Sequence, residues 1–410
     1  MFNRYSKGSM TDPVTDTLKT LNEPESDVGF LSLQGVGTTS LGNTQVTVPD
    51  VAEQMTAPHQ IKRKERYKLR RSLQRLTDSK RFKQCGRTVV NGAGVMLRKT
   101  ETKSGARAGL AGLSTCGSVW LCPVCSSKVS AQRADEVTRV IEAGMKSGLK
   151  VYMATFTVRH DKWHSLEQIW NGIGKGWRAI TSGRAGQSLK ADYGLTGWLK
   201  SVEVTWSPQN GWHVHLHVLM FLRPSESSLE VLKMTLWKAW KRGISKEGLN
   251  AQANNGGFYF TEAKGDVGAL SHYLTKQARS MAQEAVLGSE KLAKGENLTP
   301  FQIGAYAVET GDLEALEAWQ EYARISRGKK QLTWSKGLRA LADLEPEQSD
   351  EEIASQELGS SADDVLLLPS ETWRRIDVEA WRIQDLLEND GLEAVKDWLK
   401  AKALPYAYPS

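Results

Sequence analysis

The 410-residue sequence lacks any run of about 18 or more apolar residues, and its first residues lack the basic and apolar pattern of a secretory signal. We therefore expect a soluble, cytoplasmic protein with no membrane partner. Cysteine is scarce as well, with four copies in the chain. In a reducing compartment, four cysteines are expected to remain thiols or to bind a metal, not to form disulfides.

The charge is unbalanced, with a formal net charge of +7 and a sequence pI near 9.0. This excess indicates an anionic partner, with nucleic acid as the first candidate. Residues 1–60 are rich in Thr, Ser, Gly and Pro, which predicts a disordered tail. Residues 61–87 are strongly basic with roughly helical apolar spacing. Such a helix is expected to contact phosphates, and the alternative is a solvated basic face. The residues expected to bind DNA here are Lys62, Arg63, Lys64, Arg70 and Arg71.

All four cysteines lie in one region of the sequence. Cys122 and Cys125 form a CxxC pair, Cys116 lies shortly before it, and a long gap separates these three from Cys85. Four thiolates form closed, tetrahedral zinc sites in proteins. We therefore predict a structural Zn²⁺ held by Cys85, Cys116, Cys122 and Cys125. The alternative is a set of ordinary buried thiols.

Three of the seven histidines fall in the stretch Trp212–Leu222. They alternate with Val and Leu, so on a β-strand His213, His215 and His217 share one face. A row of neutral imidazoles is typical of a divalent-metal site. The alternative is an edge strand with solvated histidines.

A third metal ligand is expected from the strand that precedes the histidines, across the turn at residues 207–211. If the hairpin is centred on residue 209, Glu203 lies opposite His215, and if it is centred on residue 210, Glu203 lies opposite His217. Either pairing places this carboxylate on the histidine face. A two-residue Asn210-Gly211 turn would direct it to the other face. We favour the longer loop and predict Glu203 as a metal ligand.

Strand and helix patterns follow the order β-α-β-turn-β-α-β-α, which predicts an α+β fold with an antiparallel sheet flanked by helices. A cysteine-rich segment precedes this domain and a helical carboxy-terminal region follows it. The expected organisation is a disordered tail at 1–60, a basic and cysteine-rich segment at 61–146, the main domain at 147–290, a helical extension at 291–342, an acidic linker at 343–364 and a small element at 365–410.

A helix expected from about Asp266 to Ala285 carries Tyr273 and Lys276 on one face. A phenol has a pKa near 10, so it becomes a nucleophile at neutral pH only beside a cation or a metal. Tyr273 is therefore the candidate nucleophile, and Lys276 the residue that lowers its pKa or binds a phosphate. Taken alone, a Tyr-x-x-Lys pair is more often part of an amphipathic core.

Three motifs, in this order, resemble those of plasmid rolling-circle replication initiators (Rep proteins) of the HUH endonuclease superfamily. They are Thr155-Phe-Thr-Val158, Trp212-His-Val-His-Leu-His-Val-Leu219 and Tyr273-Leu-Thr-Lys276. The block Cys116-Gly-Ser-Val-Trp-Leu-Cys-Pro-Val-Cys125 is similar to the one before the first motif in Rep proteins of actinobacterial plasmids. The resemblance covers residues 80 to 340 approximately.

This resemblance implies that His215 and His217 hold Mg²⁺ or Mn²⁺, leaving His213 as a DNA contact. It implies that Tyr273 attacks a phosphodiester at the origin, giving a 5′-phosphotyrosyl link and a free 3′-hydroxyl primer, and that the strand is later rejoined. Origin DNA, single-stranded or cruciform, and host helicase and polymerase are the implied partners. Some members have a glutamate four residues before the tyrosine. Here that position is Ala269, so either Asp266 takes that role or termination works differently.

Three other functions remain open on the sequence. A related HUH transposase or mobilisation relaxase would use the same residues. A non-enzymatic, zinc-containing DNA-binding regulator would use the basic helix and the cysteines. A metal hydrolase or lyase built on the histidine strand leaves the basic segment and Tyr273 unexplained.

Overall fold

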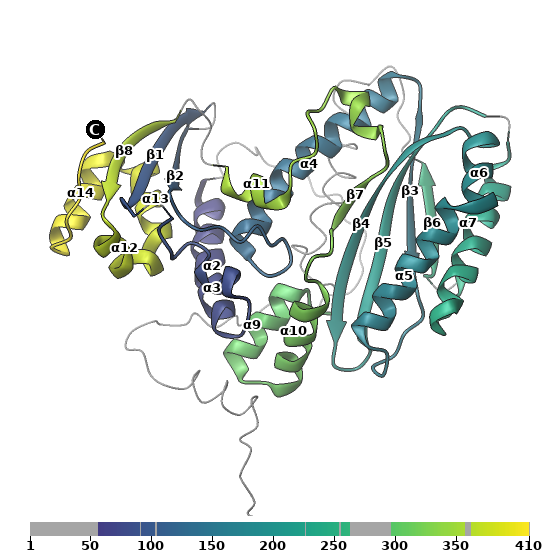
Figure 1. Cartoon of the computed structure of the whole chain (residues 1–410), viewed down its shortest axis with the longest axis horizontal. Coiled ribbons are helices and arrows are strands. Elements are labelled where there is room, and N and C mark those ends of the chain that lie inside the picture. The colour runs from purple at the N-terminus through teal and green to yellow at the C-terminus, as the bar shows by residue number, and fades with distance from the viewer. Residues whose placement is uncertain are drawn as a thin grey trace, which may run out of the picture.

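The computed structural model (Figure 1) describes residues 56–90, 92–102, 105–225, 227–253, 256–262, 297–356 and 362–409. Most of these residues belong to two antiparallel sheets and to the helices packed against them. The expected α+β class is therefore confirmed. Within the described ranges, every helix is too short or too polar to cross a bilayer.

The larger sheet has five antiparallel strands in the order β6-β3-β5-β4-β7. They are β3 (Lys150–Thr157), β4 (Leu195–Ser207), β5 (Gly211–Leu222), β6 (Phe258–Glu262) and β7 (Leu332–Trp334). The first four agree with the strands expected from β-branched and aromatic content. The short β7 was not expected, because three residues carry too little periodicity to predict a strand.

Three helices cover one face of this sheet (Figure 1). They are α5 (Leu166–Thr181), α6 (Gly183–Ala191) and α7 (Leu229–Ile244). Helix α5 begins after Ser165, whose hydroxyl oxygen accepts a hydrogen bond from the Gln168 amide. Helices α5 and α7 approach closely where Gly243 faces Gly176. A Cβ on Gly243 would lie only 2.5 Å from the Gly176 Cα, so this approach requires a residue without a side chain. The even-numbered residues of β5 form part of this core.

The opposite face of the sheet is divided along the length of β5. At the carboxy-terminal end of the strand, Leu219 and Phe221 pack in a second core with α4 (Pro123–Lys146). The histidines lie on the same face at the other end of the strand, because side chains alternate along a strand and these residues are odd-numbered too. This core does not extend to them. Helix α4 therefore anchors one half of the face and leaves the other half for polar side chains.

The smaller sheet joins the two ends of the described chain, on the left in Figure 1. Its strand order is β2-β1-β8, and Val95 of β1 pairs with Leu368 of β8. Three carboxy-terminal helices pack with this sheet around Trp373. The elements are β1 (Val95–Thr102), β2 (Gly105–Ala111), β8 (Asp363–Leu368), α12 (Ser370–Ile376), α13 (Ala380–Asn389) and α14 (Gly391–Ala401). We call them the composite module.

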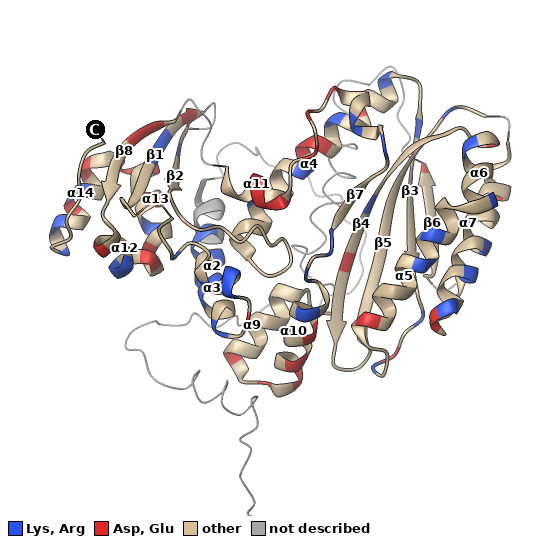
Figure 2. Cartoon of the chain, in the orientation of Figure 1, with Lys and Arg blue, Asp and Glu red and all other residues tan. Residues whose placement is uncertain are grey.

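Five further helices connect this module to the large sheet. They are α2 (Thr56–Arg75), α3 (Lys80–Gln84), α9 (Pro300–Thr310), α10 (Leu313–Ile325) and α11 (Asp350–Ser355). Helix α11 lies within the stretch 343–364 that the sequence analysis expected to be an acidic linker. It is ordered because Ile353 is buried and Asp350 pairs with Arg133 of α4, 3.3 Å away. The acids of this stretch, red in Figure 2, thus include partners of the buried Arg133 guanidinium.

Candidate metal sites and nucleic-acid face

The hairpin of β4 and β5 places Glu203 on the histidine face. Ser207 pairs with Gly211, so the hairpin is centred on residue 209, and Glu203 lies directly across from His215. This is the longer loop that the sequence analysis favoured. On the other side of β5, Thr157 of β3 also lies opposite His215. The histidine face therefore combines imidazole, carboxylate and hydroxyl groups from three adjacent strands.

His217 is nearly buried and makes two side-chain contacts. Its Nε2 lies 2.9 Å from Glu203 Oε2, and its Nδ1 lies 3.1 Å from Thr155 Oγ1. Because the carboxylate only accepts hydrogen bonds, Nε2 donates in this arrangement and Nδ1 accepts from the Thr155 hydroxyl.

The same geometry fits a shared divalent ion. Neighbouring ligands of an octahedral ion with bonds of about 2.1 Å lie about 3.0 Å apart. The separation of 2.9 Å between His217 Nε2 and Glu203 Oε2 is close to that value. When Nε2 binds a metal instead of a proton, Nδ1 carries the hydrogen and donates it to Thr155, which fixes the orientation of the ring.

His215 completes the set only after a side-chain adjustment. Its ring centroid lies 4.2 Å from that of His213 and 5.7 Å from that of His217. Among the described residues, three or more ligand atoms gather within 4.8 Å of one another only at the cysteines. Binding of one ion by His215, His217 and Glu203 together therefore requires a change of rotamer.

His213 is engaged by a histidine that the sequence analysis did not single out. His160 Nε2 lies 2.6 Å from His213 Nδ1, and His160 Nδ1 lies 3.0 Å from the Asn210 carbonyl oxygen. Because that carbonyl accepts, His160 carries its hydrogen on Nδ1, so His213 donates from Nδ1 and keeps a lone pair on Nε2. Burial, and then the neighbouring His215 and His160, lower the pKa of His213 to about 3. The imidazole row is thus neutral at this end.

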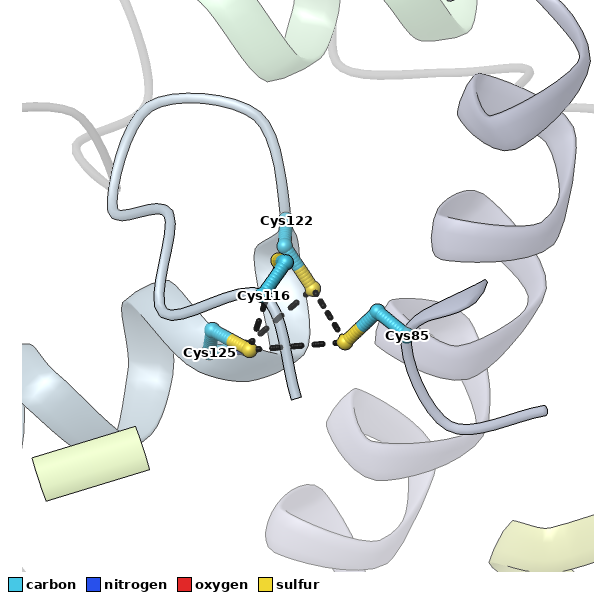
Figure 3. Close-up of side chains that lie close together, drawn as sticks. All are labelled: Cys85, Cys116, Cys122 and Cys125. Carbon is cyan, nitrogen blue, oxygen red and sulfur yellow. Dashed lines mark hydrogen bonds between the residues drawn. The ribbon is translucent and has the colours of Figure 1, made fainter. Parts of the chain in front are cut away.

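The four cysteines form a compact, buried cluster (Figure 3). The Sγ atom of Cys85 lies 3.8 Å from that of Cys122 and 3.6 Å from that of Cys125, and the Cys116 and Cys125 sulfurs are 3.7 Å apart. A tetrahedron of sulfurs around Zn²⁺, with bonds of about 2.3 Å, has an edge of about 3.8 Å. The cluster therefore has the size of a four-thiolate zinc site.

Local structure holds these thiols in place. Cys85 ends α3 and Cys122 caps the start of α4, where its Sγ accepts a hydrogen bond from the Cys125 amide. Hydrogen bonding within the cluster, from Cys116 first, lowers the pKa of Cys85 and of Cys125, whereas burial raises that of Cys122. A divalent cation would displace the thiol protons of the cluster.

Arg70 lies next to the cluster and differs from its expected role as a DNA contact. Its guanidinium carbon is 4.6 Å from the centroid of the Tyr67 ring, and a Cβ on Gly86 would come within 2.3 Å of the guanidinium. Burial opposes the charge, but Tyr67 and the nearby thiols raise the pKa of Arg70 overall. Four thiolates around Zn²⁺ would carry a net charge of about −2, which this cation offsets in part.

Three other basic residues expected to contact DNA, all with described side chains, also bind protein groups. Arg63 is buried and pairs with Asp385 and Glu388 of α13. Lys64 Nζ lies 4.9 Å from the centroid of the Trp381 ring, and Arg71 Nη1 lies 3.6 Å from Asp377 Oδ2. The carboxy-terminal helices supply these partners, and they could not be foreseen from the basic segment alone. Lys and Arg positions of α2 and α3 are coloured blue on the ribbon in Figure 2.

Several expected site residues lie outside the described residues. They are Tyr273, Lys276, Asp266 and Ala269, together with the side chain of Lys62. Two residues that the structure adds are Thr155 and His160. Thr155 belonged to the first motif, and its alternation with Thr157 was the available sign that both hydroxyls share a face. His160 follows that motif by two residues, and nothing in the pattern indicated its contact with His213.

Comparison with known proteins shows which families the chain is similar to. Residues 108–246 match the family described as "Replication protein". This segment includes three of the four cysteines, the first motif, Glu203 and the histidine row. The resemblance to plasmid Rep proteins, expected from the motifs, is confirmed.

Particular relatives agree with this class. The chain is 26% identical over 313 residues to "Protein rep" of Streptomyces lividans, covering 62% of this chain and 69% of the relative. It is 28% identical to "Protein rep" of Lentilactobacillus hilgardii, over 30% of this chain and 40% of that relative. A "Neomycin resistance protein" of Streptomyces cyanogenus is 27% identical over 32% of this chain and 35% of its own length. No solved structure matches.

Proposed function

We propose that this protein is a plasmid replication initiator that nicks one DNA strand at an origin with Tyr273 as the nucleophile. The observation that carries the proposal is the polar face of β5, where His217 and Glu203 meet at a distance suited to one divalent ion. The match of residues 108–246 to a replication-protein family supports the same conclusion.

In the proposed reaction the Tyr273 oxygen forms a bond to phosphorus while the bond from phosphorus to the 3′ oxygen breaks. The phenol proton goes to a base, and the leaving 3′ oxygen takes a proton from water to become the hydroxyl that primes synthesis. The reverse reaction, with a 3′-hydroxyl attacking the phosphotyrosine, rejoins the strand after one round. Lys276, three residues after the tyrosine, stabilises the phenolate or a phosphate oxygen.

His215, His217 and Glu203 would hold Mg²⁺ or Mn²⁺, which when bound supplies a Lewis acid for the scissile phosphate. Thr155 orients His217 through Nδ1. The four cysteines would hold a structural Zn²⁺, which joins α3 to the start of α4 and has no open position for chemistry. Origin DNA, with host helicase and polymerase, is the proposed set of partners.

The test is a denaturing gel after incubation with Mg²⁺ or Mn²⁺ and supercoiled DNA of the replicon that encodes the protein. We expect nicked circles and a protein–DNA adduct that survives SDS, both absent in Tyr273→Phe. Tyr306→Phe, at a half-exposed tyrosine on α9, is the matched control and should retain both.

A second variant tests the assignment of the nucleophile. Tyr259 of β6 is exposed and lies opposite Thr155, on the histidine face. Loss of the adduct in Tyr259→Phe, with Tyr273→Phe unaffected, would overturn the choice of Tyr273. Nicking without an adduct would indicate a water-using nuclease. DNA binding with neither would favour the non-enzymatic regulator, and joining of two different DNA ends would favour a transposase or relaxase.

A further inference from the structure

An exposed tryptophan lies on the loop that follows β3, at the end of the histidine row. Trp163 is 82% exposed, more than any other large apolar side chain in the described part of the chain. An indole ring offers a large, flat apolar surface on which another ring can stack. Nothing in the proposed cleavage reaction uses this side chain.

The loop is attached to the histidine face at several points. His160 contacts His213 and the Asn210 carbonyl, and the Arg159 amide donates to the Asn250 carbonyl at 2.7 Å. Gly211, the first residue of β5, has a φ of +70°. A Cβ added to Gly211 would lie 2.7 Å from the Lys162 Cα. The loop backbone therefore crosses directly over the start of the histidine strand.

A short hydrogen-bonded turn fixes the backbone beneath the tryptophan. The Trp163 amide donates to Asp161 Oδ1 at 2.9 Å, and His164 Nδ1 lies 2.9 Å from the same oxygen. Ser165 then caps α5 directly after the turn. Since the backbone is already ordered, a ligand that stacks on the indole pays little entropy for ordering the loop.

A lysine ammonium lies over the ring. Lys162 Nζ lies 4.8 Å from the centroid of the Trp163 ring, and both Lys162 and Arg159 are exposed. The one carboxylate of the loop, Asp161, is engaged by His164 and by the Trp163 amide. The loop therefore offers a flat aromatic surface beside positive charge, the combination that binds the base and the phosphate of a single-stranded nucleic acid.

We propose that Trp163 stacks on a base of single-stranded DNA whose backbone phosphate is bound by Lys162, next to the histidine face. The inference rests on the proposed function for the identity of the strand. A duplex does not fit, because its bases are already stacked on one another and present only their edges. The loop thus holds an unpaired part of the origin beside the site of cleavage.

The experiment measures binding of a fluorescein-labelled oligothymidine to the full chain by anisotropy, in EDTA and without cleavage. Stacking on an aromatic side chain contributes about 1–3 kcal/mol per base, so Trp163→Ala should weaken binding by about 5- to 150-fold. Trp163→Phe should retain most of the affinity. Tyr408→Ala removes another exposed aromatic ring, 61% exposed near the end of the chain, and should bind as wild type.

The salt dependence separates stacking from charge. Each phosphate contact contributes about 0.7 to the slope of log affinity against log salt for a single strand. Lys162→Ala should lower that slope by about this amount, whereas Trp163→Ala should leave it unchanged. Wild-type affinity in Trp163→Ala, or an equal loss in Tyr408→Ala, would overturn the proposal. So would stronger binding to a duplex than to the single strand.

These outcomes are independent of the cleavage reaction. If Tyr273→Phe still forms an adduct while Trp163→Ala loses binding, the proposed nucleophile fails and the stacking surface stands. If nicking requires Tyr273 but Trp163→Ala binds normally, the proposed nucleophile stands and the stacking surface fails. Because Trp163 is so exposed, its removal should leave the thermal unfolding midpoint unchanged, and a large shift would assign it a structural role instead.

Discussion

Replacement of Arg63 by alanine tests whether this residue of α2 stabilises the fold or contacts DNA. Arg63 Nη1 lies 2.7 Å from Asp385 Oδ1 and Nη2 lies 2.8 Å from Glu388 Oε1, and the three side chains are 8%, 17% and 8% exposed. Glu388 also accepts a hydrogen bond from the Ala108 amide of β2. One guanidinium thus connects α2, α13 and the small sheet.

The expected loss of stability is large because the carboxylates of Asp385 and Glu388 would be left poorly solvated without their cationic partner. Burial already raises the pKa of Asp385, and Arg63 offsets that effect. Removing one partner of a buried ion pair costs about 3–5 kcal/mol. Hydrogen exchange of α13 amides, which reports the free energy of local opening, should therefore accelerate by about two to three and a half orders of magnitude.

The control is Lys68→Ala, at an exposed position of the same helix, which should change exchange in α13 very little. Unchanged protection in Arg63→Ala would refute the structural role. If that variant instead lowered the salt slope of duplex binding by about 0.9, Arg63 would be a phosphate contact, as the basic pattern first indicated.

Three further outcomes are expected. Thr155→Val should weaken Mn²⁺ binding, measured by calorimetry, by about 10- to 100-fold, because the His217 ring loses its orienting partner; unchanged affinity would contradict that role. Arg70→Met should release Zn²⁺ to a chelator about tenfold faster, detected with a chromogenic zinc indicator, and equal rates would show that its charge is irrelevant to the thiolates. For Glu136, burial alone would raise the pKa, but hydrogen bonding to Arg339 and Arg133 lowers it below the ordinary 4.5. Its contribution to stability is therefore complete above pH 4.5 and is lost as the pH falls through the lowered pKa. Glu136→Gln should therefore lose less stability than wild type as the pH falls, with the unfolding free energy measured in urea at each pH. An unchanged pH dependence of that free energy would show that the Glu136 carboxylate is not its source.

The histidine face could be predicted because its information is local. Alternation of His213, His215 and His217 with apolar residues fixes both the strand and the face, and the length of the turn before this strand decides where Glu203 points. The register with Ser207 opposite Gly211 agrees with the longer loop. The thiol cluster was predictable for a different reason, since a CxxC pair with a third cysteine shortly before it is a spacing typical of zinc sites.

The parts that escaped prediction depend on contacts between distant segments. Strand β1 has a weak pattern of its own and is completed by β8, which supplies the pairing for Val95 and Leu97. Arg63 and Arg70 look like surface cations in the sequence, and only the acids of α13 and the thiols explain their burial. Helix α11 depends on Arg133 in the same way. Secondary-structure propensity depends on the local sequence and therefore does not indicate partners from distant segments.

The composite module also sets an order of events during synthesis. Arg63 leaves the ribosome 325 residues before its partner Glu388, which at about 5–20 residues per second is a delay of roughly 15–65 s. Over that interval the strands β3, β4 and β5 are all complete and can pair, whereas β1 still lacks β8. The larger, five-stranded sheet is therefore expected to form on the nascent chain first. The apolar side of β1 stays uncovered until translation is nearly finished, which makes it a target for chaperones and proteases.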